Sequence, residues 1–313
     1  MSKPHTVQPL ITIVTPSYNQ GRFIRATVES VLGQDYPHFE LLIFDACSTD
    51  ETAQVLRSLE GDPRMRWVSE PDQGQADAIN KGLAQARGEI FIWLNSDDLF
   101  LPGALGRVAR AWQEHGPAIY YGLARLIDAD GADLGPCPNQ SPSLDARKLL
   151  TMRALPMQPA TFVPTAAVRE CGGLDTRYHF GLDYDLWVRL AAVLPIRHVS
   201  HELALYRLHD SSKTVAQSEA FCGEADRILC SAASRGQLSL RQARAAARLF
   251  AARVYLQPTT LDLNRALTYL REAVLAAPGM TPHALVALGK AAVRQLVGER
   301  VWAQARSLRT RIV

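Results

Sequence analysis

Short apolar runs alternate with amphipathic segments over the first hundred residues. Runs of strand length predict strands, and segments with apolar residues three and four positions apart predict helices. The predicted strands are residues 10–15, 39–44, 65–69 and 90–94. The predicted helices are residues 23–32, a segment through Val55, Leu56 and Leu59 that Ser48 or Thr49 can cap, and residues 75–86. Because the strands are apolar throughout, they predict an α/β fold with a mainly parallel sheet flanked by helices on both faces.

The pattern continues to residue 213 and then changes. A helix is predicted after Pro102, and Asp130-Gly131 is a hairpin turn signal between strand-like segments. Further expected elements are a strand at 160–163, a helix at 183–193 and one or two strands at 196–208. Beyond residue 213 the chain is rich in Ala, Arg and Leu, which is typical of helices, with breaks near Pro258, Pro278 and Pro282. We therefore expect two domains, residues 1–213 and an all-helical extension at 214–313.

Composition limits the class of protein. The chain has 313 residues, 47% of them hydrophobic, which is enough for a buried core and two domains. Its net charge of +3 gives no reason to expect nucleic-acid binding. The charge is uneven, because residues up to 213 include 20 basic and 25 acidic side chains and the remainder include 14 and 6. We expect the acidic front and the basic tail to differ in role.

Several classes lose their main support. No run approaches the roughly 18 apolar residues of a membrane span, and the N-terminal sequence lacks the apolar segment of a secretory signal. Five cysteines without C-x-x-C spacing predict reduced thiols, so a cytoplasmic location is expected. Motifs typical of dinucleotide-binding dehydrogenases, P-loop NTPases, zinc proteases and serine hydrolases are absent from the sequence.

Polar loops follow all four apolar strands. In an open α/β sheet, ligands bind in the crevice at the carboxyl ends of the strands. Three of the four loops there carry carboxylates. The loops are residues 16–19, 45–50, 70–74 and 95–98.

The fourth loop, Asn95-Ser96-Asp97-Asp98, carries the strongest single signal. Adjacent carboxylates repel each other and resist desolvation, so a positive charge is expected beside them. An oxygen-ligated Mg²⁺ or Mn²⁺ that also binds substrate phosphates would supply it. The alternative is that one of the two aspartates only caps the following helix.

Single residues in the other loops are candidates with alternatives. Asp45 can hydrogen-bond a sugar hydroxyl or a base, or it can cap the turn that follows. Tyr18 can stack on a base or pack in the core. Asp77 lies four residues before Lys81, so it can bind a ligand or form an ordinary surface ion pair.

The segment at 181–187 contains two further carboxylates. Asp183 and Asp185 point about 200° apart on a helix, so they cannot share one role. Asp183 in the first turn can face a pocket and act as a general base, or cap the helix; Asp185 can cap the turn or pair with Arg189. His209 can bind metal or phosphate, although a solitary loop histidine is usually a surface residue.

Five ordered motifs together resemble the family-2 inverting glycosyltransferases with the GT-A fold. The resemblance covers about residues 8–213 and leaves the tail unexplained. The matching stretches are residues 13–19, 45–50, 74–82, 93–98 with Pro102, and 183–187.

The resemblance implies a nucleotide-diphosphate sugar donor and a divalent cation, Mn²⁺ or Mg²⁺. It implies Asp183 as the base that activates the acceptor hydroxyl. It implies metal binding by Asp97, with help from Asp98, and a role for His209 at the diphosphate. The implied nucleotide-binding residues are Pro16, Tyr18, Asp45, Asp77, Asn95 and Ser96. The chain departs from the usual family pattern at Cys47, Asn95 and Leu182.

The acceptor and the tail leave alternatives open. The expected acceptor is a glycan or a polyprenyl-linked glycan in surface polysaccharide or glycolipid synthesis. The basic segments 241–256 and 290–311 can lie on the inner face of the membrane, or pack on the catalytic domain or a second subunit as in a homodimer. The alternatives to a transferase are a nucleotidyltransferase and a non-catalytic sugar-nucleotide-binding protein.

Overall fold

A computed structural model describes residues 8–138, 140–209, 218–256 and 261–280, with residues 282, 285, 286, 288 and 289. The chain divides into two compact units, Met1–Gln217 and Ser218–Val313. The boundary expected at residue 213 and the basic segment at 290–311 lie outside the described residues.

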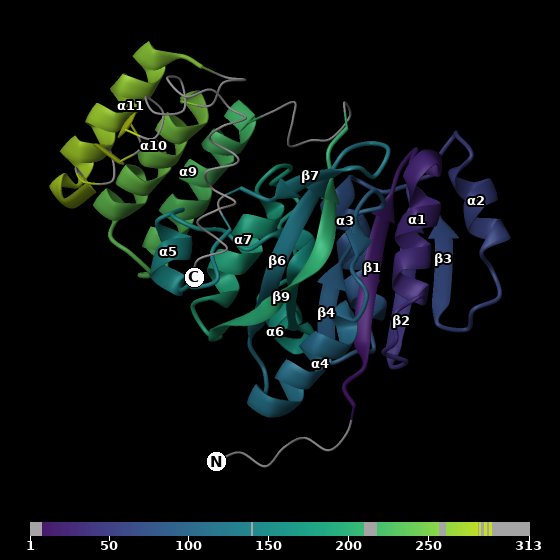
Figure 1. The fold of residues 1–313 in the computed structure, drawn as a ribbon. Coiled ribbons are helices and arrows are strands. Elements are labelled where there is room, and N and C mark those ends of the chain that lie inside the picture. Colours follow the sequence, from purple (N-terminus) through teal and green to yellow (C-terminus); the bar gives the residue numbers. More distant parts are fainter. Residues whose placement is uncertain are drawn as a thin grey trace. The chain divides into compact units, whose positions relative to one another are not determined.

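Four parallel strands form the first half of the sheet in unit 1 (Figure 1). They lie in the order β3-β2-β1-β4, and every residue of β1 and β2 is buried. This burial on both faces explains the unbroken apolar runs. The strands are β1 (Ile11–Ser17), β2 (Phe39–Asp45), β3 (Met65–Ser69) and β4 (Ile90–Trp93).

The second half of the sheet mixes directions, in the order β4-β8-β6-β9-β5. β8 runs antiparallel to both β4 and β6, whereas β6 and β9 are parallel. β7 pairs with β6 across the turn at Gly131, as the hairpin signal predicted. The α/β class is confirmed, and parallel pairing dominates only among the first four strands. The later strands are β5 (Leu99–Phe100), β6 (Ile119–Ile127), β7 (Asp133–Pro136), β8 (Thr161–Pro164) and β9 (Ile196–Arg207).

Helices cover both faces of the sheet. Residues of α1, α2 and α4 share one core with the side chains of Ile11, Ile13 and Ile92. On the other face α3 packs so closely on β1 that a Cβ at Gly82 would lie 2.5 Å from Val14. The helices are α1 (Gly21–Leu32), α2 (Thr52–Ser58), α3 (Gln75–Gln85), α4 (Ala104–His115), α5 (Ala146–Leu150), α6 (Thr165–Glu170) and α7 (Leu182–Leu190), with a 3₁₀ turn, η1 (Gln158–Ala160).

One predicted helix start was wrong. α2 begins at Thr52, and the carboxylate of Asp50 accepts a hydrogen bond from the Thr52 amide at 2.9 Å. The Ser48 hydroxyl, expected as a cap, donates instead to Asp45. Asp45, Ser48 and Asp50 of the 45–50 loop are thereby held in place before the helix starts.

Unit 2 is helical, as predicted. α9 (Ser218–Ser234), α10 (Leu240–Tyr255) and α11 (Leu263–Ala276) are followed by a 3₁₀ turn, η3 (Pro278–Met280). Arg248, one of the regularly spaced arginines of α10, lies 2.9 Å from Glu272 within this unit, which favours a packing role for this residue over a membrane-facing one. No helix in the described ranges has the length and apolar character needed to cross a bilayer.

Candidate active site

The carboxyl ends of five strands meet at one edge of the sheet. Ser17, Asp45 and Ser69, the last residues of β1, β2 and β3, are in register. Asp98 follows β4, and its carboxylate accepts a hydrogen bond from the backbone amide of Arg207, the last residue of β9, at 3.0 Å. The predicted strand-end loops therefore lie along one edge, together with an additional strand from the second half of the chain.

Asp45 is buried and its carboxylate is hydrogen-bonded. It accepts from the Ser48 amide at 3.0 Å, the Ser69 hydroxyl at 2.7 Å and the Ser48 hydroxyl. The turn-capping alternative for Asp45 is thus present in the structure. These bonds also tie the ends of β2 and β3 together.

The loop after β1 presents Tyr18 to solvent. The Tyr18 side chain is 60% exposed, so it does not pack in the core, whereas Pro16 is buried within β1. Asn19 has a left-handed backbone (φ 53°), and its amide donates to the Ser48 hydroxyl at 2.7 Å. In return Asn19 Oδ1 accepts from the Thr49 amide at 2.9 Å. Two loops that both matched the family motifs are therefore joined.

Asp97 and His209 lie in contact although 112 residues separate them. Asp97 Oδ2 lies 2.9 Å from His209 Nε2, and the two side chains are 19% and 7% exposed. The ring centroid of His209 is 4.6 Å from that of Phe23 on α1, which helps to orient the imidazole. A carboxylate and an imidazole thus meet where β4 and β9 end.

Asp98, the neighbour of Asp97, is buried in the protein. Its residue is 1% exposed, and its carboxylate accepts from the Arg207 amide and from Asn95 Nδ2 at 3.2 Å. Burial, and then the charge of Asp97, raises the pKa of Asp98 well above the usual range for a carboxyl. The inward carboxylate holds the loop to β9.

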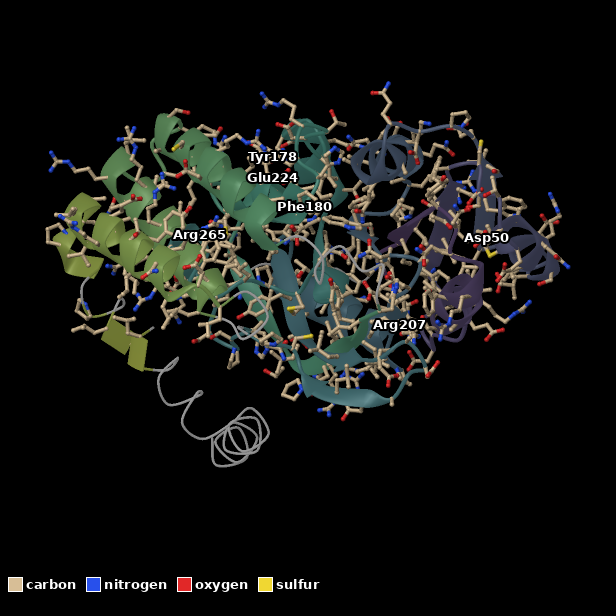
Figure 2. All side chains as sticks on the ribbon, turned by 90° about the horizontal axis from the view of Figure 1, so that it is seen from above. Asp50, Tyr178, Phe180, Arg207, Glu224 and Arg265 are labelled. Atoms are coloured by element: carbon tan, nitrogen blue, oxygen red, sulfur yellow. The ribbon has the colours of Figure 1, made fainter. Side chains whose placement is uncertain are left out.

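Arg207, labelled in Figure 2, was not among the candidate residues predicted from the sequence. Its buried guanidinium donates to the Asp97 carbonyl at 2.9 Å and to the carbonyls of Asp128 and Ala129 at 3.0 and 3.1 Å. It also lies over the Phe23 ring, 5.2 Å from the centroid. The only sequence signal was a cation at the end of a predicted strand, two residues before His209.

Asn95 connects the loop to two other elements. Its Oδ1 accepts from Gln75 Nε2 at 2.7 Å, at the start of α3, and its Nδ2 lies 3.3 Å from Gln158 Oε1. An aspartate here could not donate to Asp98, which gives a physical reason for the amide at this position. The neighbouring Ser96 is 5% exposed.

Asp77 makes the surface pairing that was one of its two expected roles. Its Oδ2 accepts from the Gln73 amide at 3.1 Å and lies 3.6 Å from Lys81 Nζ. Lys81 lies nearer to Glu70, at 3.0 Å, and its pKa is raised chiefly by the hydrogen bond to Glu70. Asp77 thereby fixes the loop at the start of α3.

Asp183 lies in the first turn of α7, beside β4. The rings of Trp93 on β4 and Trp187 on α7 stack with centroids 5.4 Å apart, which fixes the helix against the sheet. Asp183 Oδ1 accepts from the Tyr184 amide at 2.7 Å. Asp185 pairs instead with Arg189, at 2.6 Å, as its position four residues earlier allowed. The two carboxylates therefore have different partners.

The donor set at this edge fits a hard divalent cation only in part. Carboxylate oxygen and imidazole nitrogen are both ligands for Mn²⁺, and Asp97 and His209 already converge. Within the described residues, no group of three His, Cys, Asp or Glu side chains forms a fuller site. A cation held here would need further oxygen ligands, such as phosphate and water.

Comparison with known proteins identifies this arrangement. The mixed sheet with polar, mostly acidic loops at the carboxyl ends of its strands is an α/β architecture, and the family described as "Glycosyl transferase family 2" matches residues 12–170. The chain belongs to this family. It is 38% identical over 129 residues to a putative teichuronic acid biosynthesis glycosyltransferase of Bacillus subtilis, covering 41% of this chain. The chain spans about half, 51%, of that relative's length.

Solved structures share the fold at low sequence identity. TarS of S. aureus, residues 1–349 in complex with UDP-GlcNAc, has a TM-score of 0.64 at 17% identity, covering 90% of this chain and 88% of that one. The mannosyltransferase PcManGT of Pyrobaculum calidifontis, in complex with GDP-Man and Mn²⁺, has a TM-score of 0.61 at 20% identity, covering 96% and 85%. These likenesses confirm the GT-A fold predicted from the motifs.

Proposed function

We propose that this glycosyltransferase is metal-dependent and inverting, and that it transfers a sugar from a nucleotide diphosphate to a glycan or polyprenyl-linked acceptor. The observation that carries the proposal is the Asp97–His209 contact, 2.9 Å, at the edge where the strand-end loops meet. The complexes of UDP-GlcNAc and GDP-Man with similar folds support a nucleotide-sugar donor.

The donor would lie along the strand ends. The exposed ring of Tyr18 suits stacking on the base. Pro16 would support the loop that carries Tyr18, and the Asp45 carboxylate would accept a hydrogen bond from the base. Asn95 and Ser96 follow β4 and are assigned to the ribose and diphosphate end. Asp77 is assigned an indirect part, because it positions the amides of the loop before α3.

Asp97 and His209 would hold Mn²⁺ or Mg²⁺, and the Mn²⁺ complex of PcManGT supports this choice of cofactor. When bound, the cation would neutralise the charge of the departing diphosphate. Asp98 would act through its hydrogen bonds to Arg207 and Asn95, which keep the Asp97 loop in place. This role differs from the direct metal contact expected from the resemblance.

Asp183 would accept the proton of the acceptor hydroxyl. As that proton moves to the carboxylate, the oxygen forms a bond to the anomeric carbon and the bond from this carbon to the diphosphate oxygen breaks. A single displacement of this kind inverts the anomeric configuration. Trp187 on the same helix stacks on Trp93, so the helix that carries the base is anchored to the strand that precedes the Asp97 loop.

Residues 1–213 would form the catalytic domain and 214–313 a helical region of separate role. The Bacillus subtilis relative, a putative glycosyltransferase of teichuronic acid biosynthesis, supports a surface polysaccharide as the product class. We assign the reaction to the cytoplasm, where nucleotide sugars would meet a lipid-linked acceptor at the inner face of the membrane.

Product analysis tests the reaction. Purified full-length protein is incubated with UDP-, GDP- and dTDP-sugars, with and without Mn²⁺, while nucleoside diphosphate and pyrophosphate are measured. We expect nucleoside diphosphate from one nucleotide class, only with metal. Pyrophosphate released in a parallel incubation with nucleoside triphosphates and a sugar 1-phosphate would indicate a nucleotidyltransferase, and neither product, despite donor binding, would indicate a binding protein.

Two variants separate binding from chemistry. Asp97→Asn should abolish the metal-dependent thermal stabilisation by the donor. Asp183→Asn should keep this stabilisation and lower turnover by about 10²- to 10⁴-fold, the usual contribution of a general base. Glu29→Gln on α1, where the side chain is 58% exposed, is the matched control and should change neither. Turnover that survives in Asp183→Asn would show that the base is another residue.

A further inference from the structure

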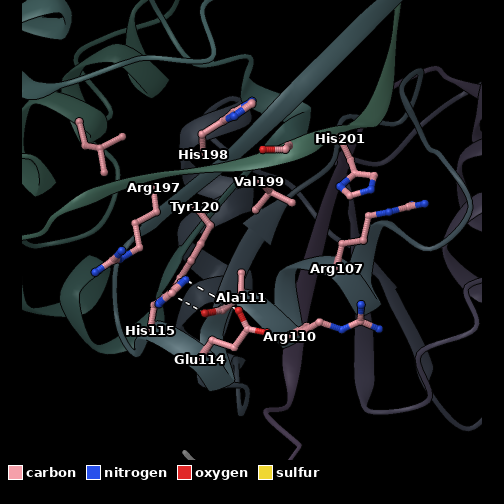
Figure 3. Close-up of a pocket in the computed structure, with 12 residues that line it drawn as sticks. Arg107, Arg110, Ala111, Glu114, His115, Tyr120, Arg197, His198, Val199 and His201 are labelled. Carbon is pink, nitrogen blue, oxygen red and sulfur yellow. Dashed lines mark hydrogen bonds and ion pairs between the residues drawn. The ribbon is translucent and has the colours of Figure 1, made fainter. Parts of the chain in front are cut away.

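A hollow of about 480 Å³ lies at the opposite end of the sheet from the candidate active site, between α4 and the first half of β9 (Figure 3). β9 runs from Ile196, beside the hollow, to Arg207, which contacts Asp98. His201, the lining residue of β9 nearest to Arg207, lies six residues before it, or about 20 Å at the usual rise per residue. The hollow is therefore remote from the Asp97–His209 pair.

One face of α4 forms a wall of the hollow. Arg107, Arg110, Ala111 and Glu114 recur at helical spacing and so share this face. The small side chain of Ala111 leaves space above the ring of Tyr120, the hydroxyl of which lies 3.0 Å from the Ala111 carbonyl. These features give the hollow a floor of Ala111 and Tyr120 that is fixed to the helix.

Positive side chains surround this floor. Arg107 and Arg110 come from α4 and Arg197 and His201 from β9, whereas Glu114 is the acidic residue in the lining. In the part of the chain that the structure describes, no carboxylate lies within ion-pair distance of Arg110 or Arg197. Both residues are exposed, and Figure 3 places them on opposite sides of the hollow.

The side chains that line the hollow differ in the contacts that they already make. Arg107 Nη1 donates to the Pro102 carbonyl at 2.7 Å, and the His198 ring packs on Tyr121, with centroids 5.1 Å apart, on the other side of the sheet from Tyr120. Figure 3 shows Arg107, Arg110 and His201 gathered on one side of the hollow and Arg197 on the other. The first three can converge on one anionic group.

We propose that this hollow is a binding site for a small ligand that carries a phosphate group. Arg107, Arg110 and His201 contact the phosphate, and Arg197 contacts a second polar or charged part of the ligand. The planar fork of arginine matches phosphate oxygens, and the volume lies in the range of small-molecule sites. The site is separate from the donor site, since it lies at the opposite end of the strands.

Calorimetry with inorganic pyrophosphate tests the site. The full chain is used with the Asp97→Asn change and in EDTA, so that metal-dependent binding at the strand ends does not contribute. We expect saturable binding that Arg110→Ala weakens about tenfold and Arg197→Ala weakens less, as expected for loss of a charge-assisted contact. Arg57→Ala, an exposed arginine on α2, is the control and should leave the affinity unchanged.

A second arm distinguishes the source of the phosphate. Flotation with phosphatidylglycerol vesicles, compared with phosphatidylcholine vesicles, reports a lipid headgroup. Binding of free pyrophosphate that depends on Arg110 supports a soluble ligand, and Arg110-dependent binding to phosphatidylglycerol alone assigns the phosphate to a lipid. If Arg110→Ala and Arg57→Ala behave alike in both arms, or nothing binds, the proposal is overturned. Donor turnover by the unmodified protein reports on the proposed function independently.

Discussion

Two buried carboxylates at opposite ends of the same sheet have opposite electrostatic surroundings. Glu40, the second residue of β2, and Asp98, after β4, are 2% and 1% exposed. Burial alone would raise the pKa of Glu40, but hydrogen bonds from the Arg87 amide, the Thr12 hydroxyl and the Arg87 guanidinium lower it. Burial and the neighbouring charge of Asp97 raise the pKa of Asp98.

The difference separates a carboxylate that stabilises the fold from one that we assign to the candidate site. Glu40 joins β1, β2 and the residues before β4, with Arg87 Nη2 at 2.8 Å and Arg66 Nη2 at 3.3 Å. Asp98 has a like charge as its neighbour, an arrangement that clusters at functional sites and lowers stability there. We therefore expect substitutions at the amino end of the strands, such as at Glu40, to alter stability only. Substitutions at the carboxyl end, such as at Arg207 or Asn95, should alter both stability and the effect of Mn²⁺ on unfolding.

The largest effect is expected from Arg207→Met. The guanidinium is buried and bonds to three carbonyls, so its loss leaves buried acceptors without donors and should lower the free energy of unfolding by about 3 kcal/mol. Urea unfolding at pH 7 measures this change, with Arg57→Ala as the control for loss of an arginine. If Arg207→Met and Arg57→Ala lower the free energy of unfolding by the same small amount, Arg207 does not hold the carboxyl ends of the strands together.

A smaller effect is expected from Glu40→Gln, about 2 kcal/mol at pH 7, because Arg87 is largely exposed and its charge is screened by water. The folded-state pKa of Glu40 lies below the unfolded value of about 4.3. Its stabilisation is therefore present above about pH 4.3 and is lost as the pH falls through the folded-state value.

Unfolding measured between pH 3 and pH 7 checks this sign. The stability difference between the unmodified protein and Glu40→Gln should shrink as the pH falls. A difference that stays constant over this range would mean that the carboxylate charge of Glu40 contributes nothing, and the contrast with Asp98 would lose its basis.

Much of the fold could be predicted because the first four strands are short, buried on both faces and apolar throughout. The bounds predicted for β3 match those in the structure, Met65–Ser69. The two-residue β5, Leu99–Phe100, has no periodicity to detect, and its pairing with β9 joins residues that lie far apart along the chain. Such long-range pairing depends on tertiary packing, which a local pattern does not contain.

For the candidate site, sequence patterns indicated most of the residues but not which of them meet. Asp97 and His209 were each candidates from local motifs, but only the pairing of β6 with β9 and the bond from Arg207 to Asp98 bring them to 2.9 Å. Arg207 itself could not be identified, because arginine is ordinarily exposed and its burial depends on carbonyls from two distant loops.

The smallest effect on stability, about 1 kcal/mol, is expected from Asn95→Asp. The change removes the donor that faces Asp98 at 3.2 Å and places a third carboxylate in the loop. Without metal the variant should unfold at a lower temperature than the unmodified protein, and Mn²⁺ should raise that temperature by a larger increment because the loop gains a charged oxygen ligand. Thermal unfolding with and without Mn²⁺ measures the loss of stability and the Mn²⁺ increment, with Asn264→Asp, an exposed asparagine on α11, as the control. If Mn²⁺ raises the unfolding temperature of Asn95→Asp no more than that of the unmodified protein, residue 95 does not face the cation. The repulsion between carboxylates at this end of the sheet would then involve Asp97 and Asp98 alone.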